Sequence, residues 1–174
     1  MRSNLVMTII GPDRPGLVQL VATRLADNGG NWLESRMVHL GGQFAGLVRA
    51  EVDREQADAL VHALESLEQE GLRVIVRAED GAVAGGAGQA ATLELVGHDR
   101  PGILRAVTTV LATHGVNVEE LASSRVSAPM GGGTLFQATI RVTVPAPEVL
   151  AQVQADFEKI SADLMVDLKL HRAE

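Results

Sequence analysis

The spacing of apolar and polar residues in the first half of the chain predicts strands and helices in a definite order. Two segments place apolar residues three and four positions apart, which is typical of a helix with one buried face. The first begins at Pro15 and stops at Asn28, and the second covers residues 54–70. β-favouring runs predict four strands, over residues 5–10, 32–40, 44–52 and 72–77. The order is therefore β-α-β-β-α-β.

The same spacing indicates which side chains face inward on the first helix. These are expected to be Val18, Val21, Ala22 and Leu25. Gly41 and Gly42 separate the second strand from the third, and two glycines at that place favour a two-residue hairpin turn.

The second half of the chain repeats this order of elements. Strands are expected over residues 93–95, 116–127, 134–144 and 166–171, and helices over residues 101–114 and from Glu148 onward. Each half then predicts a four-stranded antiparallel sheet with both helices on one face, which is an α+β fold of the ferredoxin-like type. A sheet face without helices needs another cover, and unpaired edge strands invite pairing with a second chain.

A nearly repeated hexapeptide supports two copies of one module. Residues 11–16 read Gly-Pro-Asp-Arg-Pro-Gly and residues 97–102 read Gly-His-Asp-Arg-Pro-Gly, an offset of 97 − 11 = 86. Asn31 and Asn117 match at the same offset. The chain therefore predicts a first domain at residues 1–79, a glycine-rich linker at 80–91 and a second domain at 92–174.

The match weakens after the shared asparagine. Ser35-Arg36 finds an echo in Ser124-Arg125, where the offset is 124 − 35 = 89. This predicts about three extra residues after Asn117 in the second copy. Residues 129–133 also indicate a longer turn.

Composition excludes several classes of function. The chain has no cysteine, which excludes disulfides, thiol catalysis and zinc–thiolate sites. A net charge of −7 argues against direct nucleic-acid binding, which needs a basic face. We see no signal-peptide pattern and no apolar run long enough to span a bilayer, so we expect no membrane association and a cytoplasmic location.

Catalysis has little support in the sequence. The histidines show no metal-binding spacing, and no Gly-x-Ser-x-Gly motif occurs. We expect no enzyme activity, no metal and no cofactor.

The hexapeptides lie where a strand is expected to lead into a helix, so backbone N–H groups and the positive end of the helix dipole meet there. Asp13 and Asp99 either accept a hydrogen bond from a ligand ammonium group or cap the turn. Gly16 and Gly102 allow either close ligand approach or tight helix–sheet packing.

Two further pairs of residues are candidates for ligand contact. Arg14 and Arg100 either pair with a ligand carboxylate or are solvated at the surface. Asn31 and Asn117 either bond a ligand through both amide atoms or are turn residues.

The hexapeptide, the later Gly-x-Asn and the β-α-β-β-α-β order together resemble the ACT domain family, twice along the chain. Tandem ACT domains without an attached enzyme are similar to the glycine cleavage system transcriptional repressor group. The resemblance implies a regulatory protein that binds a small amino acid, glycine or serine-like, at a seam between two domains. The implied contacts are Gly11, Asp13, Arg14, Gly16 and Asn31, with Gly97, Asp99, Arg100, Gly102 and Asn117.

Two departures from the family bear on the ligand. Serine-sensing ACT domains carry asparagine where this chain has Asp13 and Asp99, and histidine where it has Gly11 and Gly97. The resemblance therefore implies an ammonium-bearing ligand rather than serine in particular. It further implies a DNA-binding transcriptional regulator as protein partner. We also expect a homodimer. The alternative is an interaction module that needs no ligand.

Overall fold

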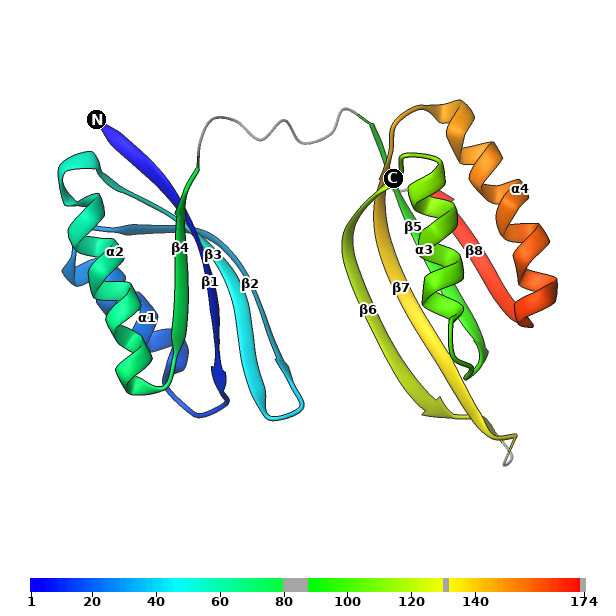
Figure 1. Cartoon of the computed structure of the whole chain (residues 1–174), viewed down its shortest axis with the longest axis horizontal. Coiled ribbons are helices and arrows are strands. Elements are labelled where there is room, and N and C mark those ends of the chain that lie inside the picture. The colour runs from blue at the N-terminus through cyan, green and yellow to red at the C-terminus, as the bar shows by residue number, and fades with distance from the viewer. Residues whose placement is uncertain (80–87, 130–131, 173–174) are drawn as a thin grey trace. The chain divides into compact units, whose positions relative to one another are not determined.

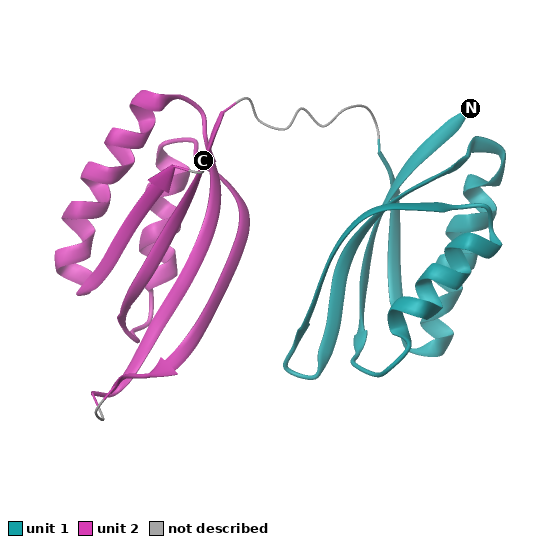
Figure 2. Ribbon diagram, turned by 180° about the vertical axis from the view of Figure 1, so that it is seen from behind, with its two compact units in different colours: residues 1–83 teal, residues 84–174 magenta. Residues whose placement is uncertain are grey.

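Two units, Met1–Val83 and Ala84–Glu174, each fold around a core of their own (Figure 2). The computed structural model describes residues 1–79, 88–129 and 132–172. Most of the expected linker, residues 80–87, lies outside the described residues, as do residues 130–131 of the expected longer turn. Strand β5 begins at Gln89, inside the expected linker, so the second unit starts earlier than the sequence predicted.

Unit 1 has the predicted order of elements and one antiparallel sheet with strand order β2-β3-β1-β4 (Figure 1). Helices α1 and α2 lie on one face of it. Short 3₁₀ segments extend α2 at both ends. The elements are β1 (Arg2–Pro12), α1 (Leu17–Asp27), β2 (Asn31–Leu40), β3 (Gln43–Asp53), a 3₁₀ turn (Arg54–Gln56), α2 (Ala57–Glu65), a second 3₁₀ turn (Ser66–Glu70) and β4 (Arg73–Ala78).

Unit 2 repeats this arrangement, with strand order β6-β7-β5-β8 and helices α3 and α4 on one face. Its elements are β5 (Gln89–His98), α3 (Ile103–Thr113), β6 (Asn117–Ser127), β7 (Thr134–Val144), α4 (Pro147–Leu164) and β8 (Val166–Arg172). The predicted α+β fold is confirmed in both halves. We call the sheet face opposite the helices of the same unit the open face.

Helices α1 and α3 begin two residues later than predicted, because a turn precedes each of them. Gly16 has φ 91° and ψ 0°, and Gly102 has φ 93° and ψ −2°. These angles match the third position of a type II turn, whose second position favours the preceding proline. A residue with positive φ cannot belong to a right-handed helix, so each helix starts after its glycine.

The buried face of α1 also differs from the prediction. Leu17, Val21 and Leu25 are buried, whereas Val18 is 47% exposed and Ala22 is also exposed. The prediction is confirmed for Val21 and Leu25 and wrong for Val18 and Ala22, because a step of one residue turns a helix by about 100° and carries a side chain off the buried stripe. The helix buries the stripe that carries Leu17 and Leu25 because these larger side chains fill more of the core.

Sheet register places the extra residues of the second copy in the β6–β7 connection, not directly after Asn117. Pro12 pairs with Gln43, and its equivalent His98 pairs with Leu135. The offset at that point is 135 − 43 = 92, which is six more than the 86 of the first strands. Both second strands carry a bulge, between Trp32 and Glu34 and between Val118 and Glu120, again 86 apart. The expected three-residue insertion is therefore wrong.

An ion-pair cluster ties α3 to α4 in unit 2. His114 Nε2 lies 2.8 Å from Asp156 Oδ2, and Lys159 Nζ lies 2.7 Å from Asp156 Oδ1. Hydrogen bonds from Lys159 first, and then from His114, hold the pKa of the Asp156 carboxyl below its ordinary value of 3.8. Because folding lowers this pKa, the cluster stabilises the fold above pH 3.8 and its contribution is lost as the pH falls through the lowered value.

We predict that Asp156→Asn lowers the thermal unfolding midpoint at pH 7, and that its difference from wild type shrinks as the pH falls below about 4. Calorimetric scans from pH 2.5 to 7 measure this difference. Asp163→Asn is the control, since Asp163 is exposed on the same helix. A difference that stays constant across this pH range would contradict the prediction.

Candidate functional site

The two hexapeptide turns occupy the same place in their units, between the first strand and the first helix. We call Asp13–Gly16 the unit 1 loop and Asp99–Gly102 the unit 2 loop. The backbone N–H of Asp13 donates to Gly42 O at 2.9 Å, and that of Asp99 donates to Thr134 O at 2.9 Å. Each loop is thus held against the far end of the hairpin formed by the second and third strands.

Backbone donors at the start of each first helix have no intrahelical partner. The first helical bonds run from Leu20 N to Gly16 O at 2.9 Å and from Ala106 N to Gly102 O at 3.0 Å. The preceding three N–H groups of an α-helix have no acceptor within it, and no side chain caps either helix. These donors and the helix dipole favour an anionic group at this place.

Positive φ explains Gly16 and Gly102, and tight packing does not. A Cβ atom built at either glycine would meet no heavy atom within 4 Å, so open space adjoins both turns. A substituent there would still be strained, because L residues rarely adopt φ near 90°. These two positions leave room beside the helix start.

Gly11 and Gly97 are packing residues instead. Both are buried in the first strand of their unit. A Cβ at Gly11 would lie 2.5 Å from Gly71 O, and one at Gly97 would lie 2.9 Å from Met165 O. The structure accounts for both by close approach to the neighbouring turn. Gly97 also lines a hollow of about 560 Å³ together with Val96 and His98.

The loop aspartates have different partners in the two units. Asp13 Oδ2 lies 3.5 Å from His39 Nε2, whereas Asp99 Oδ2 lies 2.7 Å from Arg125 Nε. Arg125 is the structural equivalent of His39, because His39 pairs with Phe44 and Arg125 pairs with Phe136 in the hairpin. Sequence reasoning missed Arg125 because it aligned this residue with Arg36. The two hexapeptides are 86 residues apart, and applying the same offset to His39 would have identified Arg125 as its equivalent.

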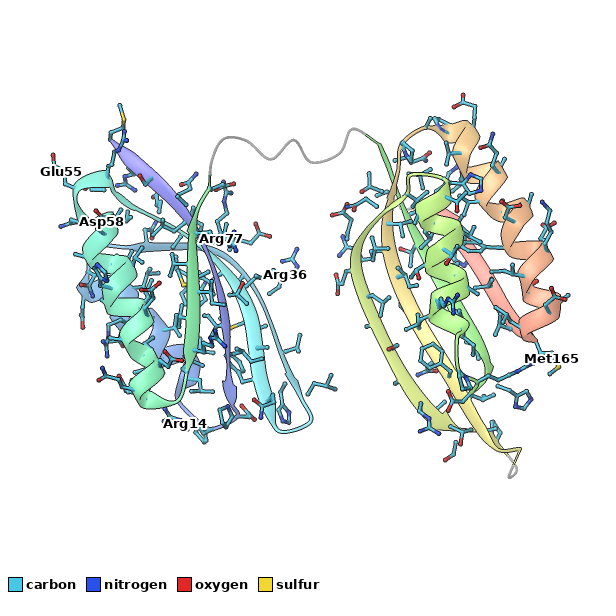
Figure 3. All side chains as sticks on the ribbon, in the orientation of Figure 1. Arg14, Arg36, Glu55, Asp58, Arg77 and Met165 are labelled. Carbon is cyan, nitrogen blue, oxygen red and sulfur yellow. The ribbon has the colours of Figure 1, made fainter. Side chains whose placement is uncertain are left out.

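The loop arginines also differ. Arg14 Nη2 donates to the backbone carbonyl of Glu70 at 2.7 Å, and Figure 3 shows Arg14 at the loop end of unit 1. Arg100 Nη2 is buried, and no residue in the described part of the chain offers it a hydrogen-bond partner. A buried donor without a partner costs free energy, so it favours any acceptor that can reach it.

A cavity of about 150 Å³ adjoins the unit 2 loop. Three residues of the unit 2 loop line one side of it, namely Asp99, Arg100 and Gly102. Three apolar residues complete the lining: Ile103, Leu104 and Phe136. Three residues predicted from the repeat therefore meet at one hollow. A larger hollow of about 400 Å³ lies over the unit 2 sheet and includes outward-facing side chains of three strands, but none of the predicted residues line it.

The asparagines do not meet the loops within either unit. Asn31 pairs with Glu51, which pairs with Asn4, near the start of β1, whereas the loop follows Pro12 at its end. The separation of 12 − 4 = 8 strand residues corresponds to roughly 26 Å. Asn117 is equally far from its loop.

Each asparagine has a local partner instead. Asn31 Nδ2 donates to Glu51 Oε1 at 3.0 Å, and Asn117 Nδ2 donates to Glu119 Oε1 at 2.6 Å. One unit alone therefore cannot bring its loop and its asparagine to the same small ligand.

Other kinds of site find no support in residues 1–79, 88–129 and 132–172. Within these ranges no three side chains of the metal-binding types come close enough together to hold an ion. None of the described helices combines the length and apolar character needed to cross a membrane.

Comparison with known proteins agrees with this fold. Family models of the ACT domain match residues 3–78 and residues 91–162, so the chain belongs to the ACT domain family. A search of curated proteins returned no match.

Two solved structures resemble the whole chain. One is a protein of unknown function from Galdieria sulphuraria, with a TM-score of 0.90, 30% sequence identity and 100% coverage of both chains. Another, with a TM-score of 0.75 and 20% identity over 100% of this chain and 99% of that one, is provisionally described as a glycine cleavage system transcriptional repressor. At 20% identity this second likeness concerns the fold.

We predict different costs for alanine at the two kinds of glycine in unit 2. Gly102→Ala should destabilise the unit by about 1–2 kcal/mol through backbone strain alone. Gly97→Ala should cost about 1–3 kcal/mol or more, because its Cβ would meet Met165 O and Val166. Calorimetry on both variants gives the shift in unfolding midpoint.

Gly132→Ala is the control, since its Cβ would come no nearer than 3.4 Å to another atom. Equal midpoints for Gly97→Ala and Gly132→Ala would show that the packing account of Gly97 is wrong.

Proposed function

We propose that this protein is a regulator that binds a small amino acid and acts by contacting another protein, rather than an enzyme or a direct nucleic-acid binder. Its two domains belong to a family of regulatory domains. The observation that carries the proposal is the cavity at the unit 2 loop, which combines a carboxylate, a guanidinium group and an uncapped helix start.

The charges around this cavity suit both ends of an amino acid. The Asp99 side chain is 27% exposed, and Arg125 Nε occupies only Oδ2, so Oδ1 can accept a hydrogen bond from an ammonium group. The uncapped N–H groups at the start of α3 can donate to a carboxylate. Charge-assisted hydrogen bonds of both signs favour a zwitterion over a ligand with a single charge.

Contact with a protein partner is supported by the open face of the unit 1 sheet. This face exposes five large apolar side chains: Ile10, Val38, Leu40, Leu47 and Ile75. Arginines stand among them, and Figure 3 shows Arg36 and Arg77 on the side of the sheet away from the helices. Exposed apolar groups interspersed with arginine are typical of protein interfaces.

The corresponding face of unit 2 has a different character. Thr8 pairs with Leu47 and Ile75, whereas its equivalent Glu94 pairs with Thr139 and Lys169. The two copies share a backbone, but only the first presents an apolar surface in this row. We infer that unit 1 contacts the protein partner and that unit 2 binds the ligand at the unit 2 loop.

We propose a DNA-binding transcriptional regulator as the partner and glycine cleavage genes as the regulated system, on the strength of the sequence resemblance. The net charge of −7 supports a protein partner over DNA itself. A cytoplasmic location and a homodimer are part of the same proposal.

The second candidate is a ligand-independent interaction module. The apolar open face of unit 1 favours it, because such a surface serves assembly whether or not a ligand binds. Binding of amino acids to the chain therefore separates the two candidates.

We expect glycine or another small amino acid at millimolar concentration to raise the unfolding midpoint of the wild-type chain. A ligand at one hundred times its Kd stabilises the native state by about 2.7 kcal/mol. Thermal unfolding with each of the twenty amino acids in turn measures the shift. Asp99→Asn should weaken binding about tenfold or more, since it removes a charged acceptor.

Glu119→Gln provides the control for this variant, because Glu119 lies at the far end of the sheet from the loop. A wild-type chain that no amino acid stabilises would favour the interaction module.

We further propose that the homodimer forms through the same open face of unit 1. The double variant Val38→Ser and Leu47→Thr, which gives unit 1 the residues of unit 2 at these places, should then weaken self-association tenfold or more. Removing two apolar side chains from a buried interface accounts for this magnitude. Analytical ultracentrifugation measures the association constant, with exposed Val18→Ser on α1 as control. An unchanged constant would place the homodimer contact elsewhere.

A further inference from the structure

We infer that the two loops have diverged, so that the unit 2 loop alone holds a ligand carboxylate, through Arg100, and that its ligand is an amino acid with a short apolar side chain or none. This inference rests on the proposed function, which places an amino acid at the unit 2 loop but leaves open whether the unit 1 loop binds one as well. It adds that the unit 1 loop does not bind, which group holds the carboxylate and which side chains fit.

The first step is the state of the two loop arginines. Arg14 already donates from Nη2 to Glu70 O, so its guanidinium group closes the unit 1 loop against the turn before β4. Arg100 Nη2 is buried without a partner, although the same motif precedes the same type of helix. A carboxylate supplies the acceptor that this donor lacks, and guanidinium binds carboxylate through two parallel bonds.

The second step is the charge around each loop. Asp99, Arg100 and Arg125 give the unit 2 loop one negative and two positive charges, with Asp99 and Arg125 paired at 2.7 Å. The unit 1 loop has Asp13 and Arg14, with His39 in the place of Arg125. The unit 2 loop therefore keeps one positive charge that no side chain of the loop neutralises, and it favours an anionic group.

The third step is the wall of the cavity opposite the charges. Ile103, Leu104 and Phe136 form it, and none of them carries a hydrogen-bonding side chain. A ligand hydroxyl placed against this wall would lose its bonds to water without gaining others, which is unfavourable. Glycine and alanine therefore fit better than serine.

The size of the cavity agrees with a small ligand. Its volume of about 150 Å³ equals that of about five water molecules in the liquid. Arg100 lines this cavity, and we expect its long side chain to turn so that Nη2 reaches a carboxylate bound there.

Calorimetric titration of the full chain with glycine, L-alanine, L-serine and glycine methyl ester tests the inference. We expect one glycine per chain, weaker binding of L-serine, and a loss of tenfold or more in affinity for the methyl ester, which lacks the carboxylate. Arg100→Gln should weaken glycine binding by a similar factor. Arg14→Gln should change it less than twofold, as should Arg105→Gln, which removes an exposed charge of α3 near the loop.

Thermal unfolding without ligand provides an independent readout. Arg100→Gln should leave the unfolding midpoint unchanged or raise it, because no hydrogen bond of Nη2 is lost. Arg14→Gln should lower the midpoint, since it removes the bond to Glu70 O. A fall in the midpoint for Arg100→Gln alone would overturn the assignment of Arg100 as a residue kept for a ligand.

The outcomes separate this inference from the proposed function. If none of the amino acids binds the wild-type chain, both fail. If glycine binds at two sites per chain, or if Arg14→Gln weakens it as much as Arg100→Gln does, the proposed function stands and the divergence of the loops is refuted. Binding of L-serine as tight as that of glycine would refute the apolar ligand class.

Discussion

The left-handed backbone of Gly16 and Gly102 is the constraint on which the rest of the candidate site depends. With φ near 90°, neither glycine can join the helix that follows. Each helix therefore starts at the residue directly after its glycine, and its first N–H groups are not capped by a side chain. The absence of a Cβ leaves space beside those donors. A proline before the glycine favours the same turn, so two adjacent residues leave backbone donors at the start of the first helix in each unit.

Around the same turn, the two loops differ in the partners of their side chains. Arg14 donates to the backbone carbonyl of Glu70, whereas Arg100 Nη2 has no hydrogen-bond partner among the described residues, and Arg125 replaces His39 beside the loop aspartate. The open faces of the two sheets also differ. The distinctive loop belongs to unit 2, whereas the apolar open face belongs to unit 1. Under the proposed function, ligand binding and protein contact are divided between the two copies, because each surface can change without altering the common fold.

Helix starts and register show the limits of prediction from the sequence. The element order was correct because apolar periodicity reports on burial, yet α1 buries Leu17 where Val18 was expected. Periodicity over one short helix defines a stripe only to within a residue or so. The insertion was misplaced because matching Ser-Arg pairs outweighed the constant spacing of the strands, which hydrogen bonding enforces residue by residue.

The sequence by itself determined the repeat, the fold of each unit and the two loops, since turns and amphipathic periods depend on residues that are near one another along the chain. Only the tertiary structure decided which candidates lie together. It separated Asn31 from its loop by the length of the sheet, closed Arg14 against Glu70 and brought Phe136 and Arg125 to the unit 2 loop. Such contacts join residues far apart along the chain, and strand pairing and packing, rather than local spacing, place them there.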